Sequence, residues 1–387
     1  MRNANYDVKL LQLCILTSIF SQIESISSLM RPIMYIAWIV TAVFFIARNR
    51  GRIVIHKCTK VFWGCYSLLA VGCIVMALFG SRHLEGNYIH IMYIPLIVSV
   101  IGENFAPFAQ NSDYEKILRT YLYGAMVYAL WVNITYFSSY NDWLKQNMYT
   151  FLQKNSAAQI WATGILIALF LLEYRTKWQR IFGYACAGYL LLLCGISQCR
   201  TAVLALAVVL VCYILLKSKY KFRWSFFILT IVLFLWNNSV TRRFIDQALL
   251  LTKYAGADIN TFSSGRLDGW DRALAAFAKS PLFGCGRYYV DCSYISVLAE
   301  IGILGFVLVE SVWITRAVSN FKVRSGLNSD AFLMCLTMFY FIESVLEGYP
   351  PFGPGVSSFM FWFLSVTFVD NKTKKIPPQG VGEISNE

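Results

Sequence analysis

Charged residues are scarce in this sequence, and that scarcity excludes a soluble multi-domain protein. Only 14% of the 387 residues are Asp, Glu, Lys or Arg, whereas a soluble globular domain carries about 25%. The apolar share is 57%, and the mean hydropathy is +0.54. Charge-free stretches of about 18 residues or more, each long enough to cross a bilayer as a helix, occupy positions 61–81, 120–141, 155–172, 181–199, 224–241 and 348–369. We therefore expect an all-α polytopic membrane protein.

Histidine and closely spaced cysteine pairs are also lacking. The histidines are His56, His83 and His90, too few for a His-rich metal site. The 11 cysteines are odd in number and scattered, with no C-x-x-C motif, so neither a zinc module nor a disulfide framework fits. Cys285 and Cys292 share one loop and would pair only if it faces an oxidising compartment. The sequence predicts no metal site.

The apolar segments predict a single membrane domain over residues 1–387 with twelve spans. These spans are expected at 9–25, 32–47, 61–80, 88–102, 117–137, 157–173, 181–198, 201–216, 224–237, 293–315, 331–346 and 356–369. With both termini in the cytoplasm, most of the 34 Lys and Arg residues fall in inner segments, which is the positive-inside distribution. The same bias accounts for the net charge of +13 without a nucleic-acid partner.

The longest hydrophilic segment, 238–292, joins the ninth and tenth predicted spans and is therefore placed outside. Positions 239–251 and 267–279 have apolar residues at i, i+3 and i+4, a pattern typical of amphipathic helices. Trp270, Leu274 and Phe277 share one face of the second helix. Loops of this length with structure of their own are usually functional, so we expect this extracytoplasmic loop to cover an active site.

Arginines at outer positions suit an anionic ligand. Arg200 occupies the turn between spans seven and eight, where an interfacial anchor is the alternative. Arg266 lies where the second loop helix begins, and preceding serines would cap that helix beside free backbone N–H groups. Arg287 follows Gly284 and Gly286, and glycines permit the backbone to come close to a ligand. Arginine forks beside aromatic rings suit a diphosphate and a sugar; a solvated loop face is the alternative.

Carboxylates near the outer side are candidate bases or ion-pair partners. Asp291 ends the loop, either as the N-cap of span ten or as a base. Glu300, Glu310, Glu343 and Glu347 lie in or beside apolar segments and are predicted to face the protein interior. Glu343 and Glu347 share a helix face because they are four residues apart. We favour pairing with the outer arginines over catalysis, since buried ion pairs need no catalytic role.

An ordered set of short motifs resembles the O-antigen polymerase and ligase superfamily, the Wzy/WaaL-type integral membrane glycosyltransferases. The motifs are Lys154-Asn155-Ser156, the Ser197–Thr201 turn, Ser264-Gly265-Arg266 with Trp270, Pro281-Leu282-x-Gly284-x-Gly286, Asp291-x-Ser293-Tyr294, Glu300-x-Gly302-Ile303-Leu304-Gly305, and Glu343-x-x-x-Glu347 followed by Gly353 and Phe361-Trp362. The likeness extends over about residues 150 to 365. Each motif is degenerate, and it is their order that carries the resemblance.

The resemblance implies a glycosyltransferase whose outer loop covers the active site and whose donor is a glycan on undecaprenyl diphosphate. No metal, cofactor or nucleotide sugar is implied. It places the chain in the bacterial cytoplasmic (inner) membrane, with the site facing the periplasm or exterior, beside a flippase and a chain-length regulator. Asp291-Cys292 stands where ligases of the family carry His-Asn, and Asp-x-Ser-Tyr is similar to the polymerase branch. We therefore predict a polymerase of O-antigen, capsule or exopolysaccharide repeat units.

Within that hypothesis, Arg200 and Arg266 neutralise the diphosphate leaving group, which needs charge neutralisation more than a proton. Asp291 steers or deprotonates the acceptor hydroxyl. The predicted substrate-binding residues are Lys154, Asn155, Arg287, Tyr288, Tyr289, Tyr294, Glu343 and Glu347.

Other functions stay open from the sequence. Twelve spans also suit a secondary transporter or a flippase for lipid-linked oligosaccharides, although no corresponding halves are found and the long loop lies outside. A ligase that transfers the glycan to a lipid A core would lack its His-Asn pair. A metal-dependent glycosyltransferase would need paired acids in the first outer loop, which offers only Glu24 and Arg31.

Overall fold

The computed structural model describes residues 4–79, 87–137, 139, 141–142, 154–172, 176–217, 220–251, 255–286, 288–322, 329–348, 350–352 and 356–370, and this part contains helices and no strand. The helices are α1 (Ala4–Phe20), α2 (Ser27–Arg48), α3 (Lys60–Phe79), α4 (Asn87–Phe105), α5 (Asn111–Tyr136), α7 (Lys154–Leu166), α8 (Lys177–Ile196), α9 (Arg200–Lys217), α10 (Lys221–Asn237), α11 (Ser239–Leu249), α12 (Ile259–Phe262), α13 (Arg266–Lys279), α14 (Ser293–Lys322), α15 (Ser329–Leu346) and α16 (Val356–Asp370). A π-helical turn, Ile167–Leu171, extends α7.

Each predicted span coincides with a helix, and the all-helical class is confirmed. Among the described residues, 4 helices are long and apolar enough to cross a membrane: Glu24–Arg48, Lys57–Val75, Lys177–Ile196 and Ser293–Phe321. Shorter apolar helices cover Ile91–Phe105, Arg200–Leu215, Ala331–Leu346 and Ser358–Thr367. These features support an integral membrane protein, whereas the number of twelve spans and their sidedness remain predictions.

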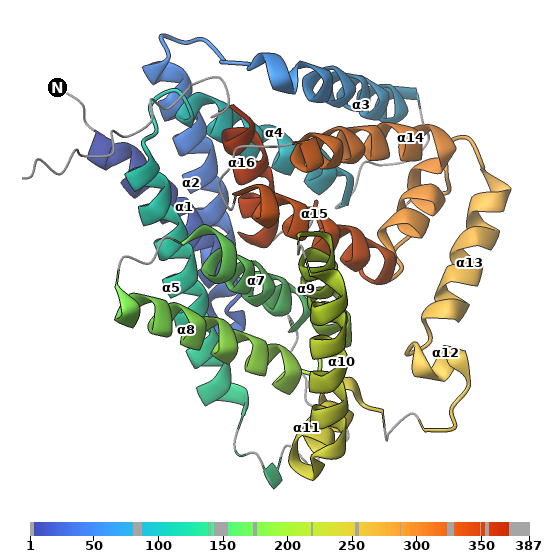
Figure 1. Cartoon of the computed structure of the whole chain (residues 1–387). Coiled ribbons are helices and arrows are strands. Elements are labelled where there is room, and N and C mark those ends of the chain that lie inside the picture. Colours follow the sequence, from blue (N-terminus) through green and yellow to red (C-terminus); the bar gives the residue numbers. More distant parts are fainter. Residues whose placement is uncertain are drawn as a thin grey trace, which may run out of the picture.

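The C-terminal helix α16 lies at the centre of the bundle (Figure 1). It packs against α4, and α14 packs against α3 while α15 packs against α9. All residues from Ser358 to Thr367 are buried, as expected for a helix that is apolar all round. Trp362 of α16 and Trp38 of α2 are fully buried and pack in this core. By contrast, Phe222 of α10 is 85% exposed, which suits a face turned to lipid.

The loop 238–292, which the sequence places outside and which is called the outer loop below, contains the two helices that its sequence pattern predicts. The first is α11 and the second is α13, which runs along the edge of the molecule next to α14 (Figure 1). The predicted apolar face of α13 needs a correction. Trp270 and Ala273 pack against Val290, whereas Leu274 is 42% exposed, so the docked face is centred one position away from Leu274.

Helix α14 is broken at Gly302, whose φ of 68° and ψ of −171° are not helical. The loop after α13 fills the break. Ile303 N donates to Pro281 O at 2.8 Å, and Cys285 N donates to Ala299 O at 2.7 Å. The backbone groups freed by the break are thus satisfied within the protein, as a low-dielectric environment requires.

Two glycines make this docking possible. A Cβ on Gly284 would lie 2.3 Å from Glu300 O, and a Cβ on Gly302 would lie 2.4 Å from the Leu282 carbonyl carbon. Both residues also have positive φ, which side-chain-bearing residues adopt with strain. The close approach that the sequence pattern indicated at Gly284 is therefore made to the backbone of α14.

Candidate active site

The carboxylate of Glu347 joins the outer loop to the helix bundle. Its Oε1 accepts hydrogen bonds from Arg266 Nη2 at 2.7 Å and from Thr201 Oγ1 at 3.1 Å. Its Oε2 accepts from Asn155 Nδ2 at 2.7 Å. The Glu347 side chain is only 6% exposed. Residues from α7, α9, α13 and the end of α15 therefore meet at one buried anionic group.

A second polar contact lies one helical turn deeper. Gln159 Nε2 donates to Glu343 Oε2 at 3.3 Å. Asn155 and Gln159 are four residues apart on α7 and share one helix face. Glu343 lies in the last turn of α15 and Glu347 directly follows that helix, with Glu347 N donating to Glu343 O at 2.7 Å, so this pair also points to one side. The two carboxylates face the interior as predicted. The sequence favours pairing of both glutamates with outer arginines: Glu347 pairs with Arg266, whereas the partner of Glu343 in this ladder is the amide of Gln159.

Arg266 is the first residue of α13. Its helix is entered through Gly265, which has a φ of 78° and provides no side-chain cap. The prediction that the preceding serines cap this helix is therefore wrong. Ser264 accepts instead from Arg200 Nη2 at 2.8 Å, and Ser263 Oγ donates to Asn260 O. The side chain of Arg266, 18% exposed, turns toward the bundle and the carboxylates there.

Asp291 completes the charged cluster. Its Oδ2 lies 3.5 Å from Arg266 Nε, and its side chain is 42% exposed. Helix α14 begins at Ser293, so Cys292, not Asp291, directly precedes it. Trp270 Nε1 donates to the Asp291 carbonyl oxygen at 3.2 Å, which holds this turn against α13. Asp291 is thus the accessible carboxylate of the cluster, and Glu347 is the enclosed one.

Arg200 is the first residue of α9 and follows the tight turn that the sequence predicts. Its guanidinium binds the loop segment that precedes α13. Nη1 donates to Phe262 O at 2.9 Å, and the guanidinium carbon lies 5.6 Å from the centre of the Phe262 ring. Arg200 therefore fixes the segment that leads into α13 and positions Arg266 from the other side.

The remaining predicted site residues divide between this cluster and other places. Tyr289 is 56% exposed, and its ring lies so close to Gly348 that a Cβ there would be 2.4 Å from it.

Tyr288 packs in the apolar cluster beneath α13, and its N–H donates to Glu300 Oε1 at 3.2 Å. Tyr294 packs on Phe341 of α15 with ring centres 6.2 Å apart. Lys154 begins α7 beside Asn155. Arg287 and Gly353 lie outside the described residues.

Charge and burial act together on two of these groups. Burial raises the pKa of Glu347, the guanidinium of Arg266 lowers it, and the nearby Asp291 raises it; the net direction is upward. Burial also raises the pKa of the Tyr289 phenol, with further increases from Asp291 and Glu347. In both groups burial is the largest cause of the upward shift, and the neighbouring Asp291 adds to it.

Thr201, Gln159 and Cys199 belong to the cluster but were not among the predicted site residues. Cys199 Sγ donates to Asn155 Oδ1 at 3.4 Å, which orients the amide toward Glu347. A signal existed for Gln159, because its spacing from Asn155 matches that between the two glutamates. Cys285 and Cys292 are both free thiols, so the disulfide that the loop allows is not formed.

Residues 185–309 match the sequence profile of the O-antigen ligase family, Wzy_C. No curated protein shows significant similarity to the chain. The matched segment covers less than half of the chain and runs from α8 through the outer loop into α14, so it includes Arg200, Arg266 and Asp291. The match supports the O-antigen polymerase and ligase superfamily broadly and, with it, an enzymatic role in an integral membrane protein.

Proposed function

We propose that this protein polymerises undecaprenyl-diphosphate-linked oligosaccharide repeat units into a surface polysaccharide on the outer face of the bacterial cytoplasmic membrane. The observation that carries the proposal is the cluster of Arg266, Asp291 and Glu347 at the seam between loop and bundle. A lipid-linked donor would reach such a seam with its diphosphate at the membrane surface. A flippase that delivers the donor and a regulator of chain length are the partners expected.

The reaction needs a positioned cation and an accessible base. The acceptor hydroxyl oxygen forms a bond to C1 of the lipid-linked sugar, the bond from C1 to the phosphate oxygen breaks, and the lipid diphosphate leaves with the bonding electrons. The hydroxyl proton passes to a base. Arg266 and Arg200 stabilise the negative charge that develops on the diphosphate, without titrating themselves. No metal or cofactor is invoked in this proposal.

Exposure separates the roles of the two carboxylates. Asp291, at 42% exposed, is open to an acceptor sugar and is the proposed base. Glu347, at 6% exposed, holds the Arg266 guanidinium in place through Nη2 and acts as a positioning residue. Tyr289, on the open side of the cluster, offers a ring face to the pyranose.

Ligation to a lipid A core is the second candidate, because the matched family is described as O-antigen ligase. Both reactions transfer a glycan from the same class of lipid-linked donor and differ in the acceptor. The polymerase is favoured here by Asp291-Cys292, which stand in place of the His-Asn pair of ligases.

The test is a gel profile of surface glycans after deletion of the gene, with rescue by wild type and by Arg266→Ala. The polymerase predicts loss of the ladder while a single repeat unit stays on its acceptor, restored by wild type only. Loss of all surface repeats with accumulation of lipid-linked polymer would show a ligase. Single lipid-linked repeats left on the cytoplasmic side would show a flippase and overturn the proposal.

A further inference from the structure

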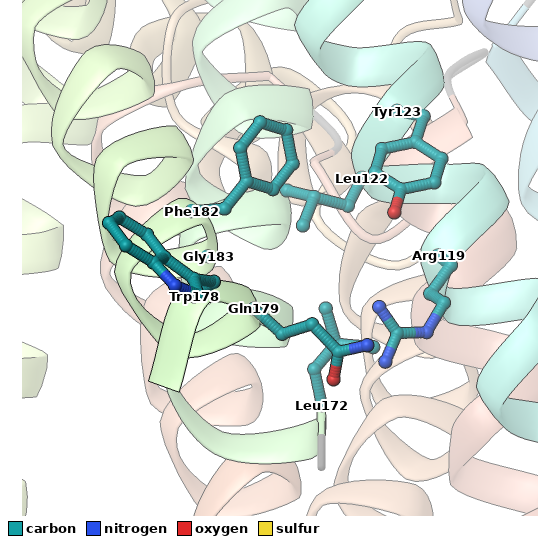
Figure 2. Close-up of a pocket in the computed structure, with 8 residues that line it drawn as sticks. All are labelled: Arg119, Leu122, Tyr123, Leu172, Trp178, Gln179, Phe182 and Gly183. Atoms are coloured by element: carbon teal, nitrogen blue, oxygen red, sulfur yellow. The ribbon is translucent and has the colours of Figure 1, made fainter. Parts of the chain in front are cut away.

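A pocket of about 290 Å³ lies between α5 and α8, away from the charged cluster (Figure 2). Its walls are mainly apolar and aromatic. The lining residues are Arg119, Leu122, Tyr123, Leu172, Trp178, Gln179, Phe182 and Gly183. Arg119 and Gln179 extend toward each other across the pocket from the two helices, the Tyr123 hydroxyl points toward Arg119, and Phe182 and Leu122 lie at the other end (Figure 2). The pocket thus has one polar end and one apolar end.

The pocket opens onto a surface suited to lipid. Among its lining residues, Trp178 is 78% exposed and Phe182 is 55% exposed. Farther along α5, Val127 is 53% exposed and Ile134 is 81% exposed. Exposed apolar side chains spaced along neighbouring helices are expected to face acyl chains, and Trp at one end marks the membrane interface. An occupant of the apolar end therefore enters from the bilayer.

Positive charge surrounds the polar end. Lys116 and Arg119 lie in the first turns of α5, and Lys177 and Arg180 lie in the first turn of α8. The acidic neighbours face the same end: Arg119 Nη2 pairs with Glu115 at 2.7 Å, and Lys116 pairs with Asp113 at 3.8 Å. Among the described residues, four basic groups against these two acids leave this end net positive. Basic pockets between membrane helices bind anionic lipid headgroups.

We propose that this pocket binds one anionic phospholipid of the leaflet surrounding the first turns of α5 and α8. The phosphodiester lies against Arg119, flanked by Lys177, and one acyl chain lies along Tyr123 and Phe182. The predicted topology makes this the cytoplasmic leaflet, the side opposite to the glycan chemistry. Because α8 leads directly into the turn that carries Arg200, a lipid at this pocket braces the helix that supports the site.

The test uses native mass spectrometry of the purified full-length chain in mild detergent, titrated with phosphatidylglycerol or with phosphatidylcholine of the same acyl chains. The wild type should retain one phosphatidylglycerol in preference to phosphatidylcholine. Arg119→Gln should weaken retention about fivefold, the effect of about 1 kcal/mol per basic group at a membrane surface. Phe182→Ala should weaken retention of both lipids, because the wall that holds the acyl chain is lost.

The matched controls are Arg272→Gln on the exposed side of α13 and Tyr184→Ala on α8, which change an arginine and an aromatic residue that do not line the pocket. Both should bind phosphatidylglycerol nearly as well as the wild type, and Arg119→Lys should restore most of the preference. Inorganic phosphate added in excess tests whether the pocket binds a free phosphate or the headgroup of a lipid. The proposal is overturned if phosphate alone displaces the lipid fully, if the two lipids bind equally, or if the control variants lose as much retention as the pocket variants.

Discussion

Arg266 Nη2 lies 2.7 Å from Glu347 Oε1, and this ion pair connects the first residue of a loop helix to a buried carboxylate 81 residues later. Taking both charges out of water is costly, and breaking such a pair by removing one partner typically costs about 3–5 kcal/mol. The loop is therefore attached to the bundle through the same arginine that is proposed to meet the diphosphate. Attachment and catalysis can be separated only by variants that change one function at a time.

Replacing Asp291 by Asn should remove the proposed base while the backbone and the Trp270 hydrogen bond to the Asp291 carbonyl remain. We expect transfer to fall by about 10²–10⁴-fold, the usual contribution of a general base. The measurement is turnover of a lipid-diphosphate-linked repeat unit in proteoliposomes. Asp271→Asn, on the exposed side of α13, should be unaffected. Full activity of Asp291→Asn would mean that this carboxylate only pairs with Arg266.

The stability of the protein should depend on pH through Glu347. Its folded-state pKa is raised above the ordinary value of 4.5, so the folded state binds more protons than the unfolded state as pH rises above that value. The free energy of unfolding therefore decreases from about pH 4.5 upward. Thermal unfolding of the wild type and of Glu347→Gln measures this, and the variant should show a shallower slope. Asp291 and Glu343 are present in both proteins, so parallel slopes would rule out Glu347 as the cause.

Alanine at Gly302 or Gly284 should prevent the loop from docking into α14. Each Cβ would meet backbone atoms at 2.3–2.4 Å, which cannot move aside cheaply, so we expect a loss of more than about 4 kcal/mol. Gly256→Ala is the matched control in the same loop, because Gly256 has a φ of 75° with nothing within 4 Å of a Cβ. It should lose only about 1–2 kcal/mol from the left-handed backbone alone. Equal losses at both positions, measured by thermal unfolding in detergent, would contradict the interlock.

Arg200→Lys keeps the positive charge and removes the paired hydrogen bonds that the guanidinium donates to Phe262 O and Ser264 Oγ. A lysine has one ammonium group and cannot reproduce that fork. We expect chymotrypsin to cleave after Phe262, which is 45% exposed, about tenfold faster than in the wild type, equivalent to about 1.4 kcal/mol. Arg272→Lys on the exposed face of α13 serves as the control. Unchanged cleavage would show that Arg200 does not hold the loop.

Local features of this protein were predictable from sequence, and long-range pairings were not. The helix that starts at Arg266 and the inward direction of Glu343 and Glu347 follow from turn residues, apolar periodicity and the cost of charge in lipid. The contact of Asn155 with Glu347 spans 192 positions, and nothing local specifies it. The break at Gly302 could not be predicted either, because one glycine in an apolar run is compatible with a continuous helix. Only the docked loop makes the break stable.

The ladder between α7 and α15 has a consequence for how the chain is made. Asn155 and Gln159 enter the membrane region well before their partners Glu343 and Glu347 have been synthesised. The two amides on α7 therefore lack these acceptors until 184 to 192 further residues have been synthesised, and a helix bundle with unsatisfied polar groups is incompletely folded. Chains that stop before α15 should consequently be removed by membrane quality-control proteases, so that correct assembly is decided by a helix that is inserted long after α7.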